Sequence, residues 1–256
     1  MHTSQRWDTA HFHEMLVELC EIKSGNYVLD LGCGTGRSLA AMLDAVGDGG
    51  KVVGLDQMAQ PLAEVASRFA RDINDKRLEL VQADVLAAPF HDGQFDAVLC
   101  QNVIECVNER EALVTEAKRL LKPGGRLLLG HHDFDGIILA SEDRDMTRRL
   151  VHGFADHKQA WQDAVEGRMG RLLPGLVTNA GFASVNIEAR LFVDFDLSPG
   201  TYAGDYIRWL VDLAPDLGIS DEDVSHWASR LTADVAQGRF FFALPWIGAV
   251  CRKPRS

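Results

Sequence analysis

The sequence predicts a doubly wound α/β fold with a mostly parallel sheet of seven strands, one antiparallel strand and a helical cap. Short apolar runs alternate with segments of helical periodicity, a glycine-rich turn follows the first run, and acidic residues end the next ones. The 256 residues, 46% of them hydrophobic and 25% charged, can bury a sizeable core. We therefore expect a single domain over residues 1–256, with residues 28–135 as its core and residues 136–175 and 196–238 as the cap.

The first half of the chain contains the elements of a parallel sheet in order. Apolar spacing predicts a helix over residues 8–22, with Asp8 as a plausible cap. A later helix, over about residues 109–121, ends where residues 122–125 (Lys-Pro-Gly-Gly) cannot continue it. Strands are expected at residues 27–31, 51–55, 78–82, 95–100 and 126–130, with helices between them.

The second half of the chain predicts the cap and the remaining strands. Residues 141–169 have helices with polar faces, and two more strands are expected at about residues 183–195 and 239–251. Two helical stretches, at about residues 201–213 and 221–236, separate these strands. Because proline lacks a ladder donor, we expect a bulge or a break at Pro245 in the last strand.

Charge and cysteine content argue against several classes of protein. The formal net charge of −11 would repel nucleic acid and anionic membranes. We find no apolar run typical of a signal peptide or a membrane span, so we expect a soluble, cytoplasmic protein. The five cysteines are widely spaced and form no C-x-x-C pair, which predicts reduced, mostly buried thiols.

A glycine-rich turn at residues 32–36 follows the first strand and precedes a helix from about Ser38. Glycine lets the backbone bend sharply and approach a ligand, while the helix N-terminus offers free N–H groups. The third glycine, Gly36, comes one residue earlier than in the dinucleotide pattern G-x-G-x-x-G. Asp30, just before the turn, would repel a pyrophosphate but favour a ligand that carries an ammonium group.

Two further acids end the second and third strands. Asp56 occupies the position at which a doubly wound fold places an acid against ribose hydroxyls. Asp84 could accept a hydrogen bond from an adenine amino group, with Val85 along the edge of the ring. Each acid could instead cap a turn or a helix. Because three acids share one rim of the sheet, we favour a nucleoside ligand.

These motifs resemble those of the class I S-adenosylmethionine-dependent methyltransferases, in the branch that methylates small molecules. VLDLGCGTGR, GLDQM, QADVLAAPF, FDAVLCQNVIECV and LLKPGGRLLLGHHD match the family's motifs in order and spacing over residues 28–135. The resemblance implies a Rossmann-like sheet whose last, antiparallel strand lies beside the fifth. It also implies S-adenosyl-L-methionine as cofactor and S-adenosyl-L-homocysteine as product. Residues 136–238 vary widely in the family, so they name no acceptor.

The same resemblance implies which residues contact the cofactor. The methionine part would lie against Asp30, the turn and Gln101, the ribose against Asp56, and the adenine between the remaining residues. Arg37 could reach the methionine carboxylate. The full set is Asp30, Gly32, Cys33, Gly34, Gly36, Arg37, Asp56, Gln57, Met58, Asp84, Val85 and Gln101.

Residues 131–135 (His-His-Asp-Phe-Asp) leave the fifth strand where the carboxyl ends of parallel strands face a ligand crevice. A base is needed only if the acceptor must lose a proton. We expect His132 or His131 to be this base and Asp133 to orient it, with the two imidazoles on opposite faces. The histidines could instead be one core and one surface residue. We expect no metal site, because the region after the fourth strand lacks the Asp of metal-dependent relatives.

Three other groups of side chains have less specific patterns. A polar set in the cap could line a lid or simply face solvent. An aromatic set is expected in the sheet core instead of forming a stacking platform. An N-terminal set could cover the cofactor, but we favour a fraying terminus. The polar set is Arg148, Arg149, His152, His157 and Trp161. The aromatic set is Phe240, Phe241, Phe242 and Trp246, and the N-terminal set is Trp7, His11 and His13.

The expected function is methyl transfer to an oxygen, nitrogen or carbon atom of a small metabolite, in secondary or specialised metabolism. The enzyme would act as a monomer or homodimer without nucleic acid or membrane partners. The alternative is a protein of the same fold that binds S-adenosylmethionine without methylating, as a regulatory subunit or as the catalyst of another rearrangement.

Overall fold

The computed structural model describes residues 10–158 and 166–255 and confirms an α/β fold. The chain divides into two compact units, which we treat separately. The unit that we call the core unit comprises Asp8–His131, Leu172–Glu188 and Gly248–Ser256. The cap unit comprises the described residues of His132–Arg171 and Ala189–Ile247.

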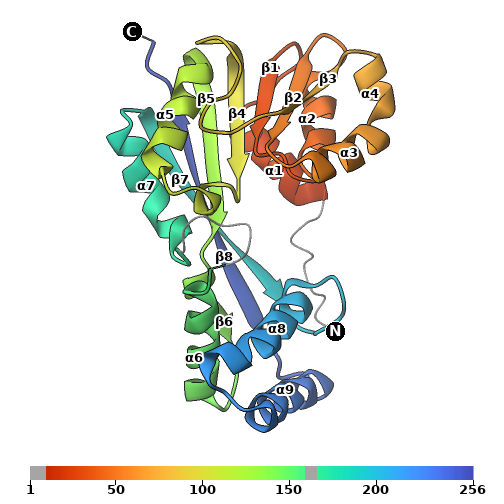
Figure 1. Ribbon diagram of the computed structural model, residues 1–256, viewed down its shortest axis with the longest axis vertical. Helices are drawn as coiled ribbons and strands as arrows, with labels where there is room; N and C mark the ends of the chain where they lie inside the picture. The colour runs from red at the N-terminus through yellow and green to blue at the C-terminus, as the bar shows by residue number, and fades with distance from the viewer. Residues whose placement is uncertain (1–9, 159–165, 256) are drawn as a thin grey trace. The chain divides into compact units, whose positions relative to one another are not determined.

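The core unit contains the parallel part of the sheet, in the strand order β3-β2-β1-β4-β5 (Figure 1). All four pairs of neighbouring strands are parallel. The order changes direction at β1 and β4, and doubly wound sheets bind ligands beyond the carboxyl ends of such strands. The strands are β1 (Tyr27–Leu31), β2 (Lys51–Asp56), β3 (Leu78–Gln82), β4 (Phe95–Gln101) and β5 (Leu121–His132).

Most of the helices in this half of the chain connect strands, and the longer ones bury one face. In α2, Leu39, Met42, Leu43 and Val46 are buried, which is the spacing of an amphipathic helix. The helices in this half of the chain are α1 (Ala10–Leu19), α2 (Leu39–Val46), α3 (Ala59–Arg68), α4 (Ala70–Asn74) and α5 (Arg110–Leu120). The five predicted strands are therefore confirmed, as is the end of α5 just before the proline.

The last strand, β8 (Phe242–Arg252), lies beside β5 as predicted. The sheet has eight strands instead of seven, because the two-residue strand β6 (Ile138–Leu139) pairs antiparallel with β8. β7 (Ala183–Asp194) also pairs with β8. Of the bulge or break predicted at Pro245, the break is wrong. β8 continues through it because the fixed φ of proline is compatible with a strand, and its carbonyl accepts a hydrogen bond from the Asp133 amide (2.9 Å).

The cap unit contains the helices predicted from residues 201–213 and 221–236. A side-chain oxygen caps the first turn of each long helix in this unit, accepting an amide hydrogen bond three residues further on. The caps are Asp143, Thr201 and Ser220, for α6 (Arg144–Ala155), α8 (Tyr202–Leu213) and α9 (Asp221–Ala236). A further helix, α7 (Met169–Asn179), precedes β7.

The buried residues confirm two expectations about side chains. Phe240, Phe242 and Trp246 are buried, as predicted for the sheet core, whereas Phe241 is half-buried. All five cysteines are free thiols, and four of them are buried. No helix in residues 10–158 and 166–255 has the length and hydropathy needed to span a bilayer.

Candidate functional site

The glycine-rich turn is held in a left-handed path by the strand beside it. The amides of Gly32 and Cys33 both donate to the Leu55 carbonyl (2.8 Å each). The φ values are +82° at Gly32, +49° at Gly34 and +69° at Gly36. Residues other than glycine rarely adopt such positive values. The three glycines are therefore required by the backbone of the turn.

Two of these glycines face very different surroundings. A Cβ on Gly32 would lie 2.4 Å from a methyl carbon of Val103, which follows β4. A Cβ on Gly34 would have no atom of the structure within 4 Å. Gly34 thus borders open space, as expected where a ligand approaches the backbone.

We expect Gly32→Ala and Gly34→Ala to differ in their effects on stability and on cofactor binding. Gly32→Ala combines left-handed strain with a close contact, so it should lower the free energy of unfolding by about 2 kcal/mol. Gly34→Ala should cost about 1 kcal/mol, and its methyl group should weaken cofactor binding. Denaturation and calorimetry of both variants check this pair. Equal stability losses with unchanged cofactor affinity would contradict it.

Arg68 holds the same turn from α3, and the sequence analysis did not identify it. Its Nη2 donates to the carbonyls of Thr35 (2.6 Å) and Gly36 (2.8 Å). These bonds help to satisfy the carbonyls of the tight turn, of which that of Gly36 also accepts from the Leu39 amide (3.4 Å). No local pattern marks this arginine, because it reaches back more than 30 residues along the chain.

Asp56, at the end of β2, binds two backbone amides of the site. Its Oδ2 accepts from Gly34 (2.8 Å) and its Oδ1 from Met58 (2.9 Å). Each carboxylate oxygen can accept a further hydrogen bond. Asp56 can therefore bind these two amides and still accept hydrogen bonds from the ribose hydroxyls, as predicted.

Asp30 is a buried carboxylate without a hydrogen-bond donor among the residues that the structure describes. Its exposed fraction is 3%, and burial, together with the nearby Asp56, raises the pKa of Asp30 to about 7. Both effects disfavour the negative charge. A ligand ammonium group would supply the missing counter-charge, so this side chain fits the methionine part of S-adenosylmethionine.

The adenine residues predicted from the resemblance lie at the ends of β2 and β3. Asp84 is exposed, and its Oδ1 accepts from the Leu86 amide (2.8 Å), so the capping role is present. Val85 is buried, whereas Met58 is a large apolar side chain that is 51% exposed. The Gln57 carbonyl accepts from Gln82 (3.1 Å). An exposed thioether next to Asp56 suits contact with an adenine face.

Gln101 and Arg37 are the last two residues predicted to contact the cofactor. Gln101 ends β4 and is followed by Asn102, a non-glycine residue with a φ of +55°. Positive φ at such a residue is uncommon, and here the Asn102 amide donates to the Gly130 carbonyl on β5 (3.0 Å). Arg37 is exposed and lies just before Ser38, the N-cap of α2.

The N-terminal set departs from the expectation of a fraying terminus. His13 lies in α1, is buried, and places its Nδ1 3.1 Å from the Ser38 hydroxyl, directly after the turn. Helical packing, which the sequence analysis underestimated, explains this position. His11 is exposed on the same helix, and Trp7 lies outside the described residues.

The two histidines proposed as bases have different partners. In the core unit, buried His131 places its Nε2 3.3 Å from a carboxylate oxygen of Glu105, which follows β4. In the cap unit, buried His132 places its Nε2 2.8 Å from the Tyr202 hydroxyl. Neither is a surface residue, and neither partner was predicted.

Asp133 pairs with an arginine instead of orienting an imidazole, which corrects the predicted contact. Its Oδ2 accepts from the Arg171 amide (3.2 Å) and Nε (2.9 Å), and its Oδ1 accepts from Nη2. A buried carboxylate binds most stably to a bidentate guanidinium, which a neighbouring imidazole cannot match. Arg171 also contacts Asp135 (3.1 Å).

Comparisons with known proteins identify a methyltransferase domain within the chain. Residues 29–129 match the model of a methyltransferase domain. The chain is 30% identical over 172 residues (67% of this chain, 48% of the relative) to an uncharacterised 37.1 kDa protein of transposon Tn4556 from Streptomyces fradiae. It is 37% identical over 115 residues (44% of each chain) to the chloroplastic 2-phytyl-1,4-beta-naphthoquinone methyltransferase of Arabidopsis thaliana.

A solved structure shares the fold over nearly the whole chain. The YcgJ protein of Bacillus subtilis superposes with a TM-score of 0.62 and 20% identity, over 97% of this chain and 100% of that one. The match assigns residues 29–129 to a methyltransferase domain, whose cofactor is S-adenosyl-L-methionine. It spans about half the length of the curated relatives it matches.

Proposed function

We propose that this protein transfers the methyl group of S-adenosyl-L-methionine to an oxygen, nitrogen or carbon atom of a small metabolite. The observation that carries the proposal is the buried, uncompensated Asp30 beside a turn with open space at Gly34. The match to a methyltransferase domain and the name of the naphthoquinone relative support a small acceptor with an apolar part.

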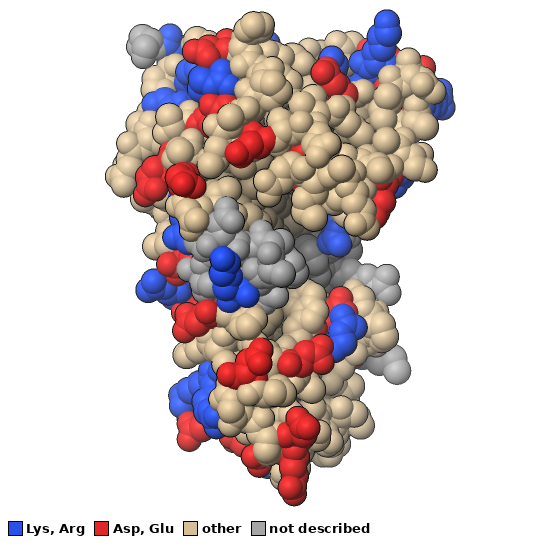
Figure 2. Space-filling model, in the orientation of Figure 1, with Lys and Arg blue, Asp and Glu red and all other residues tan. Residues whose placement is uncertain are grey.

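A small acceptor also agrees with the charge of the protein. The formal net charge is −11, and Figure 2 shows acidic side chains interspersed with basic ones on the visible face. Nucleic-acid binding relies on extended positive surfaces that neutralise phosphates. We propose that the protein acts in secondary or specialised metabolism, as a monomer or homodimer.

The residues of the core unit would bind and orient the cofactor. Asp30 would face the ammonium group, Asp56 would accept from the ribose hydroxyls, and the turn would contact the methionine part. The bound cofactor supplies a methyl group activated by its sulfonium. The protein's contribution is to align this group with the acceptor and to exclude water.

We propose His131 as the base for an acceptor that must lose a proton, with Glu105 in the orienting role. A carboxylate next to an imidazole favours its protonated form and fixes its orientation. His132, with Tyr202 as its partner, remains the second candidate.

Incubation with labelled S-adenosylmethionine and a metabolite extract tests the activity. A labelled small product would support methyl transfer, and its mass would begin to identify the acceptor. The alternative is a protein that binds the cofactor without methylating. Micromolar binding with no labelled product from any extract would favour that alternative.

Titration of Asp30 predicts that cofactor affinity depends on pH. The ammonium group needs the ionised carboxylate, so affinity should rise about tenfold from pH 5.5 to 7, below the range in which the amino group itself titrates. In the ligand-free protein, the free energy of unfolding depends on pH in the opposite direction. Since the pKa of Asp30 is raised from 3.8 to about 7, the folded state binds more protons in that window, and stability falls as pH rises through it.

Asp30→Asn should remove the pH dependence of cofactor affinity and the loss of stability of the ligand-free protein near neutral pH. Cofactor binding should become weak and nearly independent of pH, while the ligand-free protein gains stability near neutral pH. Asp84→Asn is the matched control, because it removes an exposed carboxylate from the same edge of the sheet and should keep the pH slope. Calorimetry at several pH values measures the affinities. A flat profile for the unmodified protein would refute the role of Asp30.

A further inference from the structure

The cap unit contains a cavity of about 240 Å³ beside α6, which includes none of the residues assigned to the cofactor and neither His131 nor His132. Its volume is below the roughly 300–1,000 Å³ of sites for drug-sized ligands, so it suits a smaller molecule. One side consists of β6 and its neighbours, and the other of α6. The lining residues are Ile137, Ile138, Leu139, Ser141, Arg144, Thr147, Arg148, Val151 and His152.

The α6 side of the cavity carries a row of basic side chains. Arg144, Arg148 and His152 follow one another at intervals of four residues, which places them on one face of the helix. Among the described lining residues there is no acid. The cavity therefore presents donors and positive charge without an internal counter-ion.

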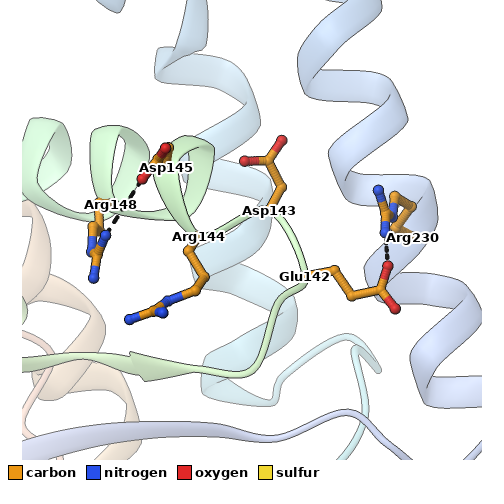
Figure 3. Close-up of a pocket in the computed structure, with 6 residues that line it drawn as sticks. All are labelled: Glu142, Asp143, Arg144, Asp145, Arg148 and Arg230. Carbon is orange, nitrogen blue, oxygen red and sulfur yellow. Dashed lines mark hydrogen bonds and ion pairs between the residues drawn. The ribbon is translucent and has the colours of Figure 1, made fainter.

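The acids next to the cavity already have partners. Figure 3 shows the adjoining hollow, where Asp145 pairs with Arg148 (3.4 Å) and Glu142 pairs with Arg230. Asp143 caps α6 by accepting from the Met146 amide (3.0 Å).

Within the described part of the chain, the guanidinium of Arg144 has no ion-pair or hydrogen-bond partner, and Arg144 borders both hollows. The pair between Asp145 and Arg148 is mostly exposed, with side-chain exposures of 94% and 57%. Such pairs are weak, so Arg148 can exchange its partner for a bound anion. Two guanidinium groups are thus available on one face of α6.

The opposite side of the cavity is apolar. Ile137 and Leu139 line it, and Ile138 is 50% exposed, whereas Val151 lies on the α6 side. An apolar wall facing guanidinium groups matches a ligand with one charged end and one hydrophobic arm.

We propose that this cavity binds a small amphiphilic anion, with a carboxylate or phosphate-ester head on Arg144 and Arg148 and a short hydrocarbon arm on Ile138. Guanidinium groups bind both kinds of head through paired N–H groups. The Ser141 hydroxyl and His152 add polar contacts at the charged end. The proposal stands independently of the acceptor that the enzyme methylates.

Titration with hexanoate and with hexyl phosphate, followed by NMR shifts of the α6 amides, tests the site. We expect at least one of them to bind in the millimolar range or tighter, with the stronger one identifying the head group. The double variant Arg144→Gln and Arg148→Gln should weaken binding at least tenfold. Neutral hexanamide should bind much more weakly than either anion.

Two controls separate this site from general attraction of anions. Arg208→Gln removes an exposed arginine that pairs with Asp205 (3.0 Å), in the same i,i+3 arrangement as Asp145 and Arg148. It should leave binding unchanged. Ile138→Ser should weaken hexanoate but not acetate. Absence of binding by both anions, or equal losses in the Arg208 variant and the double variant, would overturn the proposal.

Discussion

Replacing His131 by Ala is expected to lower the turnover number by about a hundredfold or more, with cofactor affinity unchanged. The imidazole is buried and lies 3.3 Å from Glu105, so its loss removes a proton acceptor without touching the contacts of Asp30 or Asp56. Steady-state kinetics with the acceptor identified by labelling, together with calorimetry of the cofactor, measure the two quantities.

Glu105→Gln distinguishes a chemical role of this pair from a packing role. The amide keeps the shape but loses the charge that favours protonated imidazole. Turnover should fall less than in the His131 variant, and the acidic limb of the pH profile should move to lower pH. A packing role would leave that limb in place.

His132→Ala and Tyr202→Phe test the second candidate in the same assay. If only these variants lose turnover, His132 is the base and the assignment of His131 is wrong. If all the histidine variants keep their turnover, the acceptor is already a free nucleophile or the base is His152 or His157.

Arg171→Gln is expected to lower the free energy of unfolding by about 3 kcal/mol, because it strands a buried carboxylate. Asp133 is 1% exposed, and three groups of Arg171 donate to it, of which only the backbone amide would remain. The Arg171 side chain is 46% exposed, so water can partly solvate Asp133 once the guanidinium is removed. The expected loss of stability is therefore at the lower end of the range for broken buried ion pairs.

Two variants make this expectation specific. Arg168→Gln removes a more exposed arginine that pairs with Glu166 (2.8 Å), and it should have little effect. Adding Asp133→Asn to Arg171→Gln should recover part of the lost stability, because the neutral amide costs less to bury than the charge. Urea denaturation measures all three proteins. An Arg171→Gln variant as stable as the original protein would show that the pair contributes nothing.

Local patterns were sufficient to predict the parallel sheet and the turn. The strand at 27–31 agrees with β1, because a buried parallel strand is a short apolar run that can be recognised without its partners. The strand at 78–82 agrees with β3, which lies at the edge of the sheet and is only partly buried. β6 was missed, since two residues carry no periodicity. The motif from Asp30 to Gly36 could be predicted because its residue types and spacing lie within one short segment, although the groups that hold it come from other parts of the chain.

The partners of the site residues could not be predicted, because they come from distant parts of the sequence. Asp133 meets Arg171, 38 residues later, and His132 meets Tyr202, 70 residues later. Neither spacing has a periodicity that could be recognised. Glu105 lies in a short 3-10 helix after β4, where the sequence analysis considered only whether an Asp for a metal was present.

The two amide bonds of Asp56 have a consequence for redesigning the specificity of this protein. Exchanging an acid at this position for a basic or neutral residue is an obvious route toward cofactors that carry a phosphate on the ribose. Here the same carboxylate also holds Gly34 and Met58 in place. An altered side chain would therefore lose the shape of the binding loop along with the sugar preference, and a compensating acceptor for both amides must be introduced at the same time.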